Sequence, residues 1–208
     1  MFIKCLVVGA LQTNAYIVGC PVKKTAAVID PGAESERILG QLTAAGLTTY
    51  CILLTHGHYD HIGGLAELRR ATRAPVAVHF ADAVLLTDVG ANLSLNFGRG
   101  SAPGPPEREL KHGDIIEIGD ERLEVYHAPG HTPGGVCFAG PGVVFTGDTL
   151  FAGSIGRTDF PGGDFRELIE SCKKLLHLPD ETIVYPGHGP ASSIGEERVH
   201  NPFLTTDW

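Results

Sequence analysis

In the first third of the chain, short runs rich in valine, isoleucine and aromatic residues alternate with turn-forming residues. Such runs predict β-strands, and they lie at Phe2–Val8, Ala15–Val18 and Ala26–Ile29. The sequence Asp-Pro-Gly at 30–32 then interrupts the strand pattern. Apolar residues next recur at helical spacing, which predicts a helix over Glu34–Ala45 that stops at Gly46.

The rest of the chain again shows groups of strands followed by helices. The apolar pattern predicts helices over Ile62–Thr72, Ala81–Thr87 and Phe165–Leu176. It predicts strands over Cys51–Leu54, Pro75–His79, Ile115–Ile118, Leu123–His127, Val136–Phe138, Val143–Phe145 and Thr182–Tyr185. This order indicates an α/β protein in which two sheets pack face to face with helices outside, a four-layer αββα sandwich.

One long segment, Gly90–Glu109, lacks this pattern and is rich in glycine and proline. We predict a surface loop there, and a loop of this length in a compact domain is often functional. The sequence leaves open whether the loop is a lid over a site or a contact between subunits.

The composition narrows the class of protein. A chain of 208 residues with 43% hydrophobic and 19% charged residues is expected to form one folded domain over 1–208. The net charge of −8 argues against nucleic-acid binding, because phosphate contacts need clustered lysine and arginine. It also argues against binding to anionic membranes, and no stretch is long enough to cross a bilayer. The oligomeric state is not specified by the sequence.

The cysteines and the N-terminus bear on the compartment. The five cysteines are scattered and form no Cys-x-x-Cys pair, which argues against a disulfide framework and a cysteine-rich zinc site. Four of them lie in apolar surroundings and are predicted to be core residues. The apolar run at the N-terminus is shorter than a signal peptide requires. These features predict a cytoplasmic protein.

The densest cluster of polar residues, Thr-His-Gly-His-Tyr-Asp-His at 55–61, directly follows a predicted strand. His56 and His58 are two positions apart, so in an extended segment both side chains point the same way and could face one metal ion. Asp60 and His61 lie where the chain turns into a helix and could face a second ion. Imidazole and carboxylate groups together suit zinc, iron or manganese.

Three more residues of the same types, His131, Asp148 and His188, each follow a predicted strand in a turn rich in glycine or proline. Such turns place side chains at the rim of a sheet, where functional sites are commonly built. Two metal ions at such a site can produce a hydroxide nucleophile at neutral pH, so we predict a two-metal hydrolytic centre. The five other histidines are expected to be ordinary surface or core residues: His79, His112, His127, His177 and His200.

The pattern His56-x-His58-x-Asp60-His61, with the three later residues in this order, resembles the metallo-β-lactamase superfamily over nearly the whole chain. The resemblance implies two ligand sets joined by a bridging Asp148: His56, His58 and His131 for one ion, and Asp60, His61 and His188 for the other. Asp60 and Asp148 are then the catalytic carboxylates. Two divalent ions are implied, with zinc expected first and iron or manganese as alternatives, and a water between them attacks a carbonyl. Asp30, in a matching strand-end motif, would orient the ligands.

Within this superfamily, the segment 147–164 is similar to the short, bacterial-type glyoxalase II enzymes. The substrate implied is a small-molecule thioester, an acylated glutathione such as S-lactoylglutathione. Longer glyoxalase II enzymes carry a C-terminal helical domain with basic glutathione contacts, whereas about twenty residues follow His188 here. Another thioester therefore stays open. The commonest β-lactamase subclass has cysteine in place of Asp148, which disfavours antibiotic hydrolysis as the main role.

Two residues are candidates for substrate binding. Arg157 could hold a substrate carboxylate in a bidentate pair, or it could pair with Asp159 inside a tight loop. Tyr59 could line the substrate pocket or serve only in packing.

A second enzyme class fits the same residues. Persulfide dioxygenases resemble this chain in fold and in the segment Gly-Arg-Thr-Asp-Phe at 156–160. They hold one iron by residues that match His56, His131 and Asp148, so the ligands do not separate the two activities. The sequence Gly-Ser-Ile-Gly at 153–156 favours the hydrolase. A non-catalytic metal-binding module is a third hypothesis, and no substituted ligand position supports it.

Overall fold

Two six-stranded sheets form the centre of the computed structural model, which describes residues 1–97 and 100–205. The strands of the first sheet follow one another in sequence order, antiparallel from the first to the third strand and parallel from the third to the sixth. They are β1 (Phe2–Val8), β2 (Thr13–Cys20), β3 (Thr25–Ile29), β4 (Thr48–Leu53), β5 (Val76–His79) and β6 (Arg108–Leu110).

The second sheet has the strand order β14-β13-β10-β9-β8-β7, and its one parallel pair is β10 with β13. Its strands are β7 (Ile115–Ile118), β8 (Glu121–His127), β9 (Val136–Gly140), β10 (Val143–Gly147), β13 (Ile183–Pro186) and β14 (Ser192–Ser193). A separate two-stranded ribbon follows β10 and consists of β11 (Leu150–Phe151) and β12 (Ser154–Ile155).

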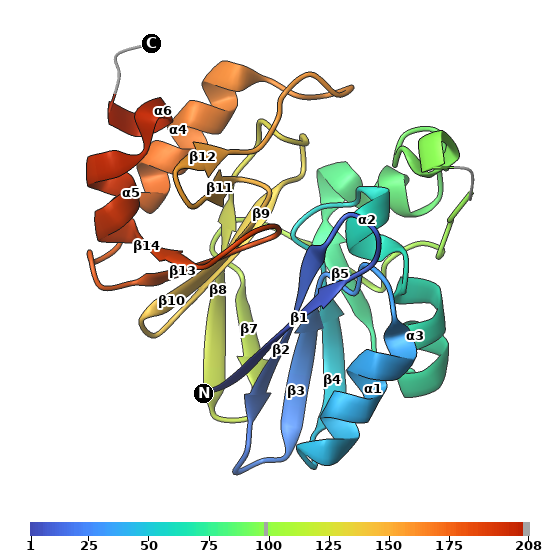
Figure 1. Ribbon diagram of the computed structural model, residues 1–208. Helices are drawn as coiled ribbons and strands as arrows, with labels where there is room; N and C mark the ends of the chain where they lie inside the picture. Colours follow the sequence, from blue (N-terminus) through green and yellow to red (C-terminus); the bar gives the residue numbers. More distant parts are fainter. Residues whose placement is uncertain (98–99, 206–208) are drawn as a thin grey trace.

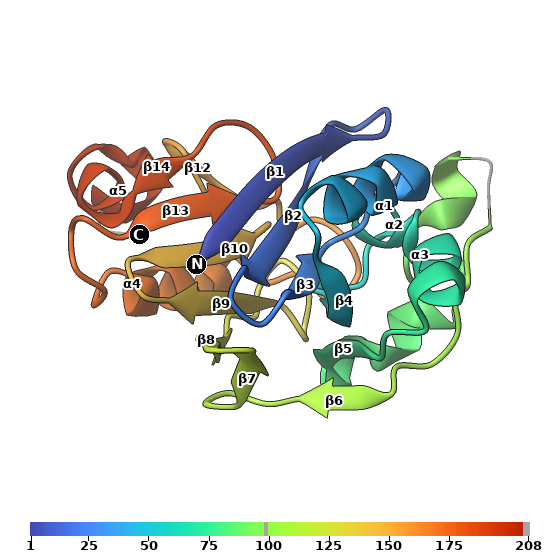
Figure 2. The ribbon, with the colours of Figure 1, turned by 90° about the horizontal axis from the view of Figure 1, so that it is seen from below.

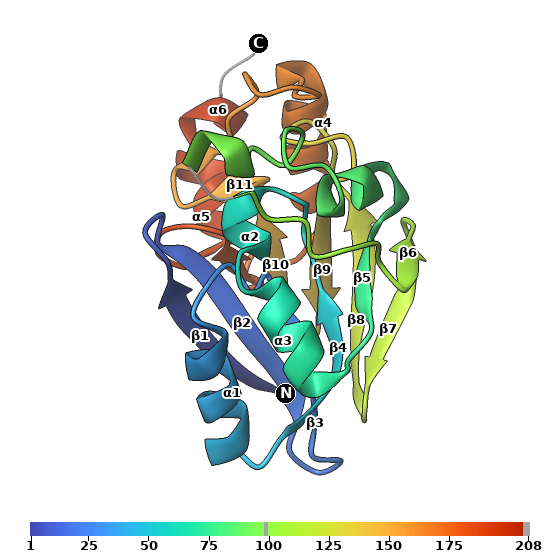
Figure 3. The same cartoon turned by 90° about the vertical axis from the view of Figure 1, so that its right-hand side faces the viewer.

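Helices cover the outer faces of both sheets (Figures 1 and 2). The first sheet is covered by α1 (Ser35–Ala44) and α3 (Leu65–Thr72), which lie in front of it in Figure 3. The second is covered by α4 (Phe165–Leu175), α5 (Ile194–His200) and α6 (Pro202–Thr205). The short α2 (Tyr59–Ile62) and the 3₁₀ helices η1 (Phe80–Leu86) and η2 (Ser94–Phe97) lie in connections. The predicted αββα sandwich is confirmed.

Strand β2 shows how the sequence builds these layers. Its side chains alternate between the two faces of the sheet. Tyr16 and Val18 pack between the sheets, where Phe138 is fully buried, while Ala15 and Ile17 pack under the outer helices. Since both faces of β2 are covered, all of its residues are buried.

The helix predicted over Ile62–Thr72 is wrong as a single element. It is divided into α2 and α3 by Gly63 and Gly64. The turn containing Gly32 passes close to this point, and a Cβ atom on Gly63 would lie 2.3 Å from the Gly32 carbonyl oxygen. The close approach of two backbone segments therefore requires glycine and ends the helix early. The helix predicted over Ala81–Thr87 is the 3₁₀ helix η1.

The loop predicted over Gly90–Glu109 is wrong in part, because it contains η2 and the first residues of β6. Buried Asn92 folds the segment back on itself, since its side-chain amide donates to the carbonyl oxygens of Leu85 and Ser101 at 2.8 and 2.7 Å. Gly98, which contributed to the loop prediction, lies outside the described residues. A lid or a subunit contact in this segment stays a prediction.

The remaining structural expectations concern the cysteines and the membrane. All five cysteines are free, and four are buried, as predicted, while Cys5 is exposed. In the described part of the chain, no helix has the length and apolar character needed to span a membrane.

Candidate metal centre

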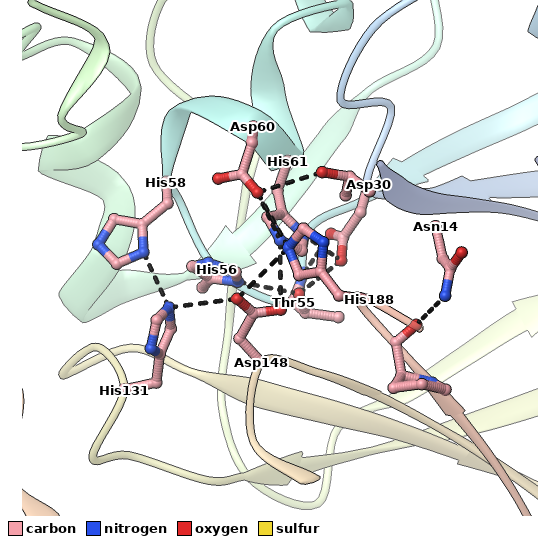
Figure 4. Close-up of polar contacts among 12 residues, drawn as sticks. Asn14, Asp30, Thr55, His56, His58, Asp60, His61, His131, Asp148 and His188 are labelled. Carbon is pink, nitrogen blue, oxygen red and sulfur yellow. Dashed lines mark hydrogen bonds and ion pairs between the residues drawn. The ribbon is translucent and has the colours of Figure 1, made fainter. Parts of the chain in front are cut away.

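The seven predicted ligand residues meet at one edge of the two sheets (Figure 4). They lie in the four connections that follow β4, β8, β10 and β13, with Asp60 and His61 in α2, so one ligand cluster joins both sheets. Within each of three groups, the possible ligand atoms lie within 4.8 Å of one another. These groups are His56, His58 and His131; His56, His61 and Asp148; and Asp60, His61 and His188.

The first predicted ligand set consists of buried imidazoles. His58 lies in an extended conformation just before α2, and its Nδ1 lies 2.9 Å from Nε2 of His131. Burial, reinforced by the neighbouring histidines, lowers the pKa of His56 and lowers that of His58 to about 3. Both rings are therefore neutral at neutral pH, the state in which imidazole binds a metal.

The second predicted set mixes a carboxylate with two imidazoles. Asp60 Oδ2 lies 3.0 Å from His188 Nε2 and 3.5 Å from His61 Nε2. Burial opposes ionisation of Asp60, but the two histidines lower its pKa below the usual range. Burial likewise opposes protonation of His61, yet Asp60 and Asp148 raise its pKa. The carboxylates thus favour positive charge in this part of the cluster.

Asp148 lies between the two sets (Figure 4). Its Oδ1 lies 3.3 Å from Nε2 of His61, and its Oδ2 lies 3.6 Å from His131 and 3.7 Å from His188. Burial raises the pKa of this carboxyl, but His61 lowers it further, so the net shift is downward. An ionised carboxylate here can reach both sets, although its bridging role stays a prediction.

The polar atoms of this cluster fit divalent metal ions. Among the described residues, His56 Nε2 is buried without a hydrogen-bond partner, and His61 Nε2 and Asp148 Oδ1 are buried 3.3 Å apart but form no hydrogen bond. Burying such atoms unpaired costs about 1–3 kcal/mol each, and a cation within the cluster would remove that cost. Imidazole nitrogen and carboxylate oxygen are ligands of zinc, iron and manganese.

Asp30 contacts Thr55 and the predicted ligand His61, as expected for the orienting residue that the resemblance implied. Its Oδ1 accepts a hydrogen bond from the Thr55 backbone N–H at 2.8 Å, and its Oδ2 accepts one from the Thr55 hydroxyl at 2.6 Å. Oδ2 also lies 2.9 Å from Nδ1 of His61. A proton on Nδ1 leaves Nε2 of His61 free to face the cluster, which is how such partners orient metal ligands.

The sequence analysis missed Asp82, a buried acid in η1. Its carboxylate accepts hydrogen bonds from Gly57 N at 3.1 Å, Thr132 Oγ1 at 2.8 Å and Gly134 N at 2.7 Å. It therefore ties together the loops that carry the first ligand set. A single acid inside the apolar segment 80–86 was the available signal, because an acid is rarely buried without partners.

A cavity of 460 Å³ opens beside the ligand cluster. Both predicted substrate contacts, Tyr59 and Arg157, line it. Its apolar lining residues are Leu11, Leu93, Phe151, Ile155 and Phe160. The Arg157 guanidinium lies 3.9 Å from the centre of the Phe160 ring and makes two hydrogen bonds to the Asp159 carboxylate, at 2.7 and 2.6 Å. The structural pair is thus formed at the cavity wall, and a substrate contact by Arg157 stays a prediction.

Comparison with known proteins identifies the family. The family model described as the metallo-β-lactamase superfamily matches residues 8–188. The chain belongs to the metallo-β-lactamase superfamily. Hydroxyacylglutathione hydrolase GloC of Haemophilus influenzae is 37% identical, over 99% of this chain and 99% of its own length. A probable metallo-hydrolase of Bacillus subtilis, YqgX, is 39% identical over 95% of this chain and 94% of its own length.

Three solved structures of high similarity also belong in this comparison. BLEG-1 B3 metallo-β-lactamase has a TM-score of 0.94 and 40% identity, covering 99% of this chain and 100% of its own. TTHA1623 in a di-iron-bound form has a TM-score of 0.87 and 43% identity, covering 97% and 100%. ETHE1 from Myxococcus xanthus has a TM-score of 0.82 and 32% identity, covering 97% and 84%. Superfamily proteins of different names thus share this fold with the chain.

Proposed function

We propose that this superfamily member hydrolyses thioesters with the help of two divalent metal ions, and that acyl-glutathiones such as S-lactoylglutathione are its first candidate substrates. The observation that carries the proposal is the pair of ligand sets around Asp148 beside the 460 Å³ cavity. The similarity to hydroxyacylglutathione hydrolase GloC over nearly the full length supports the substrate class.

The ligand residues have distinct tasks in this proposal. Neutral His56 and His58 present ring nitrogens, while ionised Asp60 and Asp148 supply negative charge. Two divalent ions held there supply Lewis acidity, which lowers the pKa of water and polarises a carbonyl oxygen. Asp148 places Oδ1 near His61 of the second set and Oδ2 near both His131 of the first set and His188 of the second, so its carboxylate can join the two sets.

The cavity wall orients the substrate. Phe151, Ile155 and Phe160 exclude water from the reacting bond and contact the apolar part of the acyl or thiol group. The Arg157 guanidinium faces the same cavity and offers a positive charge to a substrate carboxylate, in competition with Asp159. The mixture suits a thioester that has both an apolar portion and an anionic end.

One preparation of the protein should be tested for metal content and for activity. We expect about two ions per chain, release of thiol from S-lactoylglutathione and no oxygen consumption. Glutathione persulfide with oxygen uptake is the comparison assay, because a dioxygenase would use one iron on His56, His131 and Asp148. A β-lactam should be included, since BLEG-1 is named as a B3 metallo-β-lactamase. One iron per chain, oxygen uptake and no thiol release would refute the proposal.

The variant His188→Ala separates the two enzyme classes, because His188 belongs only to the second ligand set. Two-metal hydrolysis predicts that this variant keeps one ion and that its kcat/KM falls about 100-fold or more. Mutation of a residue that only hydrogen-bonds to a ligand already lowers metal affinity or activity about 10–100-fold. His58→Ala, in the first set, should lose hydrolysis in the same way. Wild-type rates in both variants with one ion per chain would favour the mononuclear enzyme.

A further inference from the structure

The beginning of β2 contributes none of the predicted ligands, yet Thr13 contacts Asp60, and Asn14, which is labelled in Figure 4, contacts the loop that carries His188. The Thr13 hydroxyl donates a hydrogen bond to Asp60 Oδ2 at 3.1 Å. The side-chain amide of Asn14 donates to the carbonyl oxygen of Pro186 at 3.0 Å and to that of Gly189 at 2.9 Å. These two carbonyls flank His188 in the chain.

Backbone contacts reinforce this connection. The Asn14 N–H donates to the Gly187 carbonyl oxygen at 2.7 Å, and Thr13 forms an isolated antiparallel bridge with His188. Further along β2, the Tyr16 hydroxyl donates to the Pro186 carbonyl oxygen at 2.6 Å. The loop that carries His188 therefore rests on a strand of the opposite sheet.

The loop needs such external support because glycines lie on both sides of His188. Gly189 has a φ of 75°, a region that favours glycine, and a Cβ on Gly187 would lie 2.3 Å from Asp148 Oδ1. Glycine gives a backbone more freedom than any other residue, so the hydrogen bonds from β2 restrict this loop, together with the bond that Gly187 N donates to the Gly147 carbonyl oxygen at 2.8 Å. Thr13 and Asn14 are 1% and 3% exposed, and water therefore competes little for their bonds.

We propose that Thr13 and Asn14 form a clamp that holds Asp60 and His188 in the arrangement that binds the second metal ion. Both are positioning residues, since they act through the ligands. The inference rests on the proposed metal-binding role of the second ligand set. Asn14 is suited to the task because its amide has two hydrogens and meets two carbonyl oxygens, which an aspartate at this position would repel.

The test uses Asn14→Ala and Thr13→Val, with Thr13→Ser as the conservative variant that keeps the hydroxyl. Asn201→Ala is the matched control, because Asn201 is fully buried and its amide also donates two hydrogen bonds, to Ser154 O and Glu197 Oε2. Asn201→Ala removes these two bonds and also the one that Phe203 N donates to Asn201 Oδ1 at 3.0 Å, and none of the three involves a residue of the ligand cluster.

Zn²⁺ titration of the metal-free proteins against a competing chelator is the first readout. In Asn14→Ala and Thr13→Val we expect the affinity for the second ion to fall about 10–100-fold, the range for residues that orient ligands. The first ion should bind as in the wild type, Thr13→Ser should retain both affinities, and Asn201→Ala should do the same. An equal fall in the affinities for both ions, or an unchanged affinity for each, would contradict the proposed role of Thr13 and Asn14.

Amide hydrogen exchange of the metal-free proteins is the second readout, and it needs neither metal nor substrate. Asn14→Ala should accelerate exchange at residues 187–189, whereas Asn201→Ala should leave these amides protected. Unchanged exchange there would overturn the clamp. If the wild type binds a single ion, the proposed two-metal function fails, and hydrogen exchange still decides whether Asn14 holds the loop.

Discussion

At the scale of single residues, the two ligand sets differ in their affinity for protons. Burial and neighbouring imidazoles lower the pKa values of His56 and His58. Carboxylates outweigh burial at His61 and His188 and raise theirs. A proton therefore competes with a metal for the second set at a higher pH than for these two members of the first set.

This difference predicts a pH-dependent loss of one ion. Below its pKa a histidine carries the proton that a metal must displace, so the raised values at His61 and His188 weaken metal binding first as the pH falls. We expect the ion content to drop from two towards one as the pH falls below the raised pKa values of His61 and His188, while the lowered pKa values of His56 and His58 keep their rings available to the first ion. Dialysis against buffered Zn²⁺, followed by metal analysis, measures this. Simultaneous loss of both ions would contradict it.

The candidate ligands could be predicted from the sequence, whereas most residues that support them could not. His56, His58, Asp60 and His61 lie within six positions, so local spacing reveals them. Asn14 contacts Pro186, which lies 172 positions away in the sequence, and neither an asparagine nor a proline marks a functional site by its chemistry. A contact of this kind depends on how the two sheets pack against each other, and it cannot be predicted from a local sequence pattern.

At the scale of elements, Gly63 separates α2, which carries Asp60 and His61, from α3. Gly63→Ala places a Cβ 2.3 Å from a backbone oxygen, so we expect the free energy of unfolding to fall by about 2–4 kcal/mol, in the range of severe core changes. Gly40→Ala is the control, because Gly40 is an exposed position in α1 with nothing within 4 Å of the added atom.

The control should stabilise the protein by about 1 kcal/mol, the difference in helix propensity between alanine and glycine. Urea unfolding of the metal-free proteins measures both variants, and the Zn²⁺ affinity of Gly63→Ala should fall as well, because α2 must move. Equal stability of the two variants would show that the close approach at Gly63 has no energetic consequence.

The long elements could be predicted well because their apolar periodicity is strong. The strand over Phe2–Val8 and the helix beginning at Phe165 agree with β1 and α4. The short ribbon β11–β12 and the C-terminal helix α5 were not predicted. Two-residue strands have no period to recognise, and tertiary contacts hold them: Gly153 N donates to the Glu197 carboxylate of α5 at 2.9 Å.

At the scale of the whole molecule, the ligand cluster lies across the boundary between the two sheets. The loop after β4 supplies four of the predicted ligands from the first sheet, and the loops after β8, β10 and β13 supply three from the second. The sheets are also joined by the apolar core between them and by the hydrogen bonds from Asn14 to the loop that carries His188. Metal binding therefore connects both halves of the fold and must couple to its stability.

Removal of metal should lower the melting temperature strongly. An ion at a hundredfold excess over its Kd stabilises the folded state by about 2.7 kcal/mol, so two ions contribute about 5 kcal/mol. In a domain of this size, each kcal/mol shifts Tm by about 2–4 °C, which gives a fall of about 10–20 °C after chelation. His188→Ala, with one site remaining, should lose about half as much on chelation, because the second ion is already absent. Thermal scans with Zn²⁺, with chelator and with Zn²⁺ restored measure the difference, and an identical fall in both proteins would mean that the second ligand set holds no ion in the wild type.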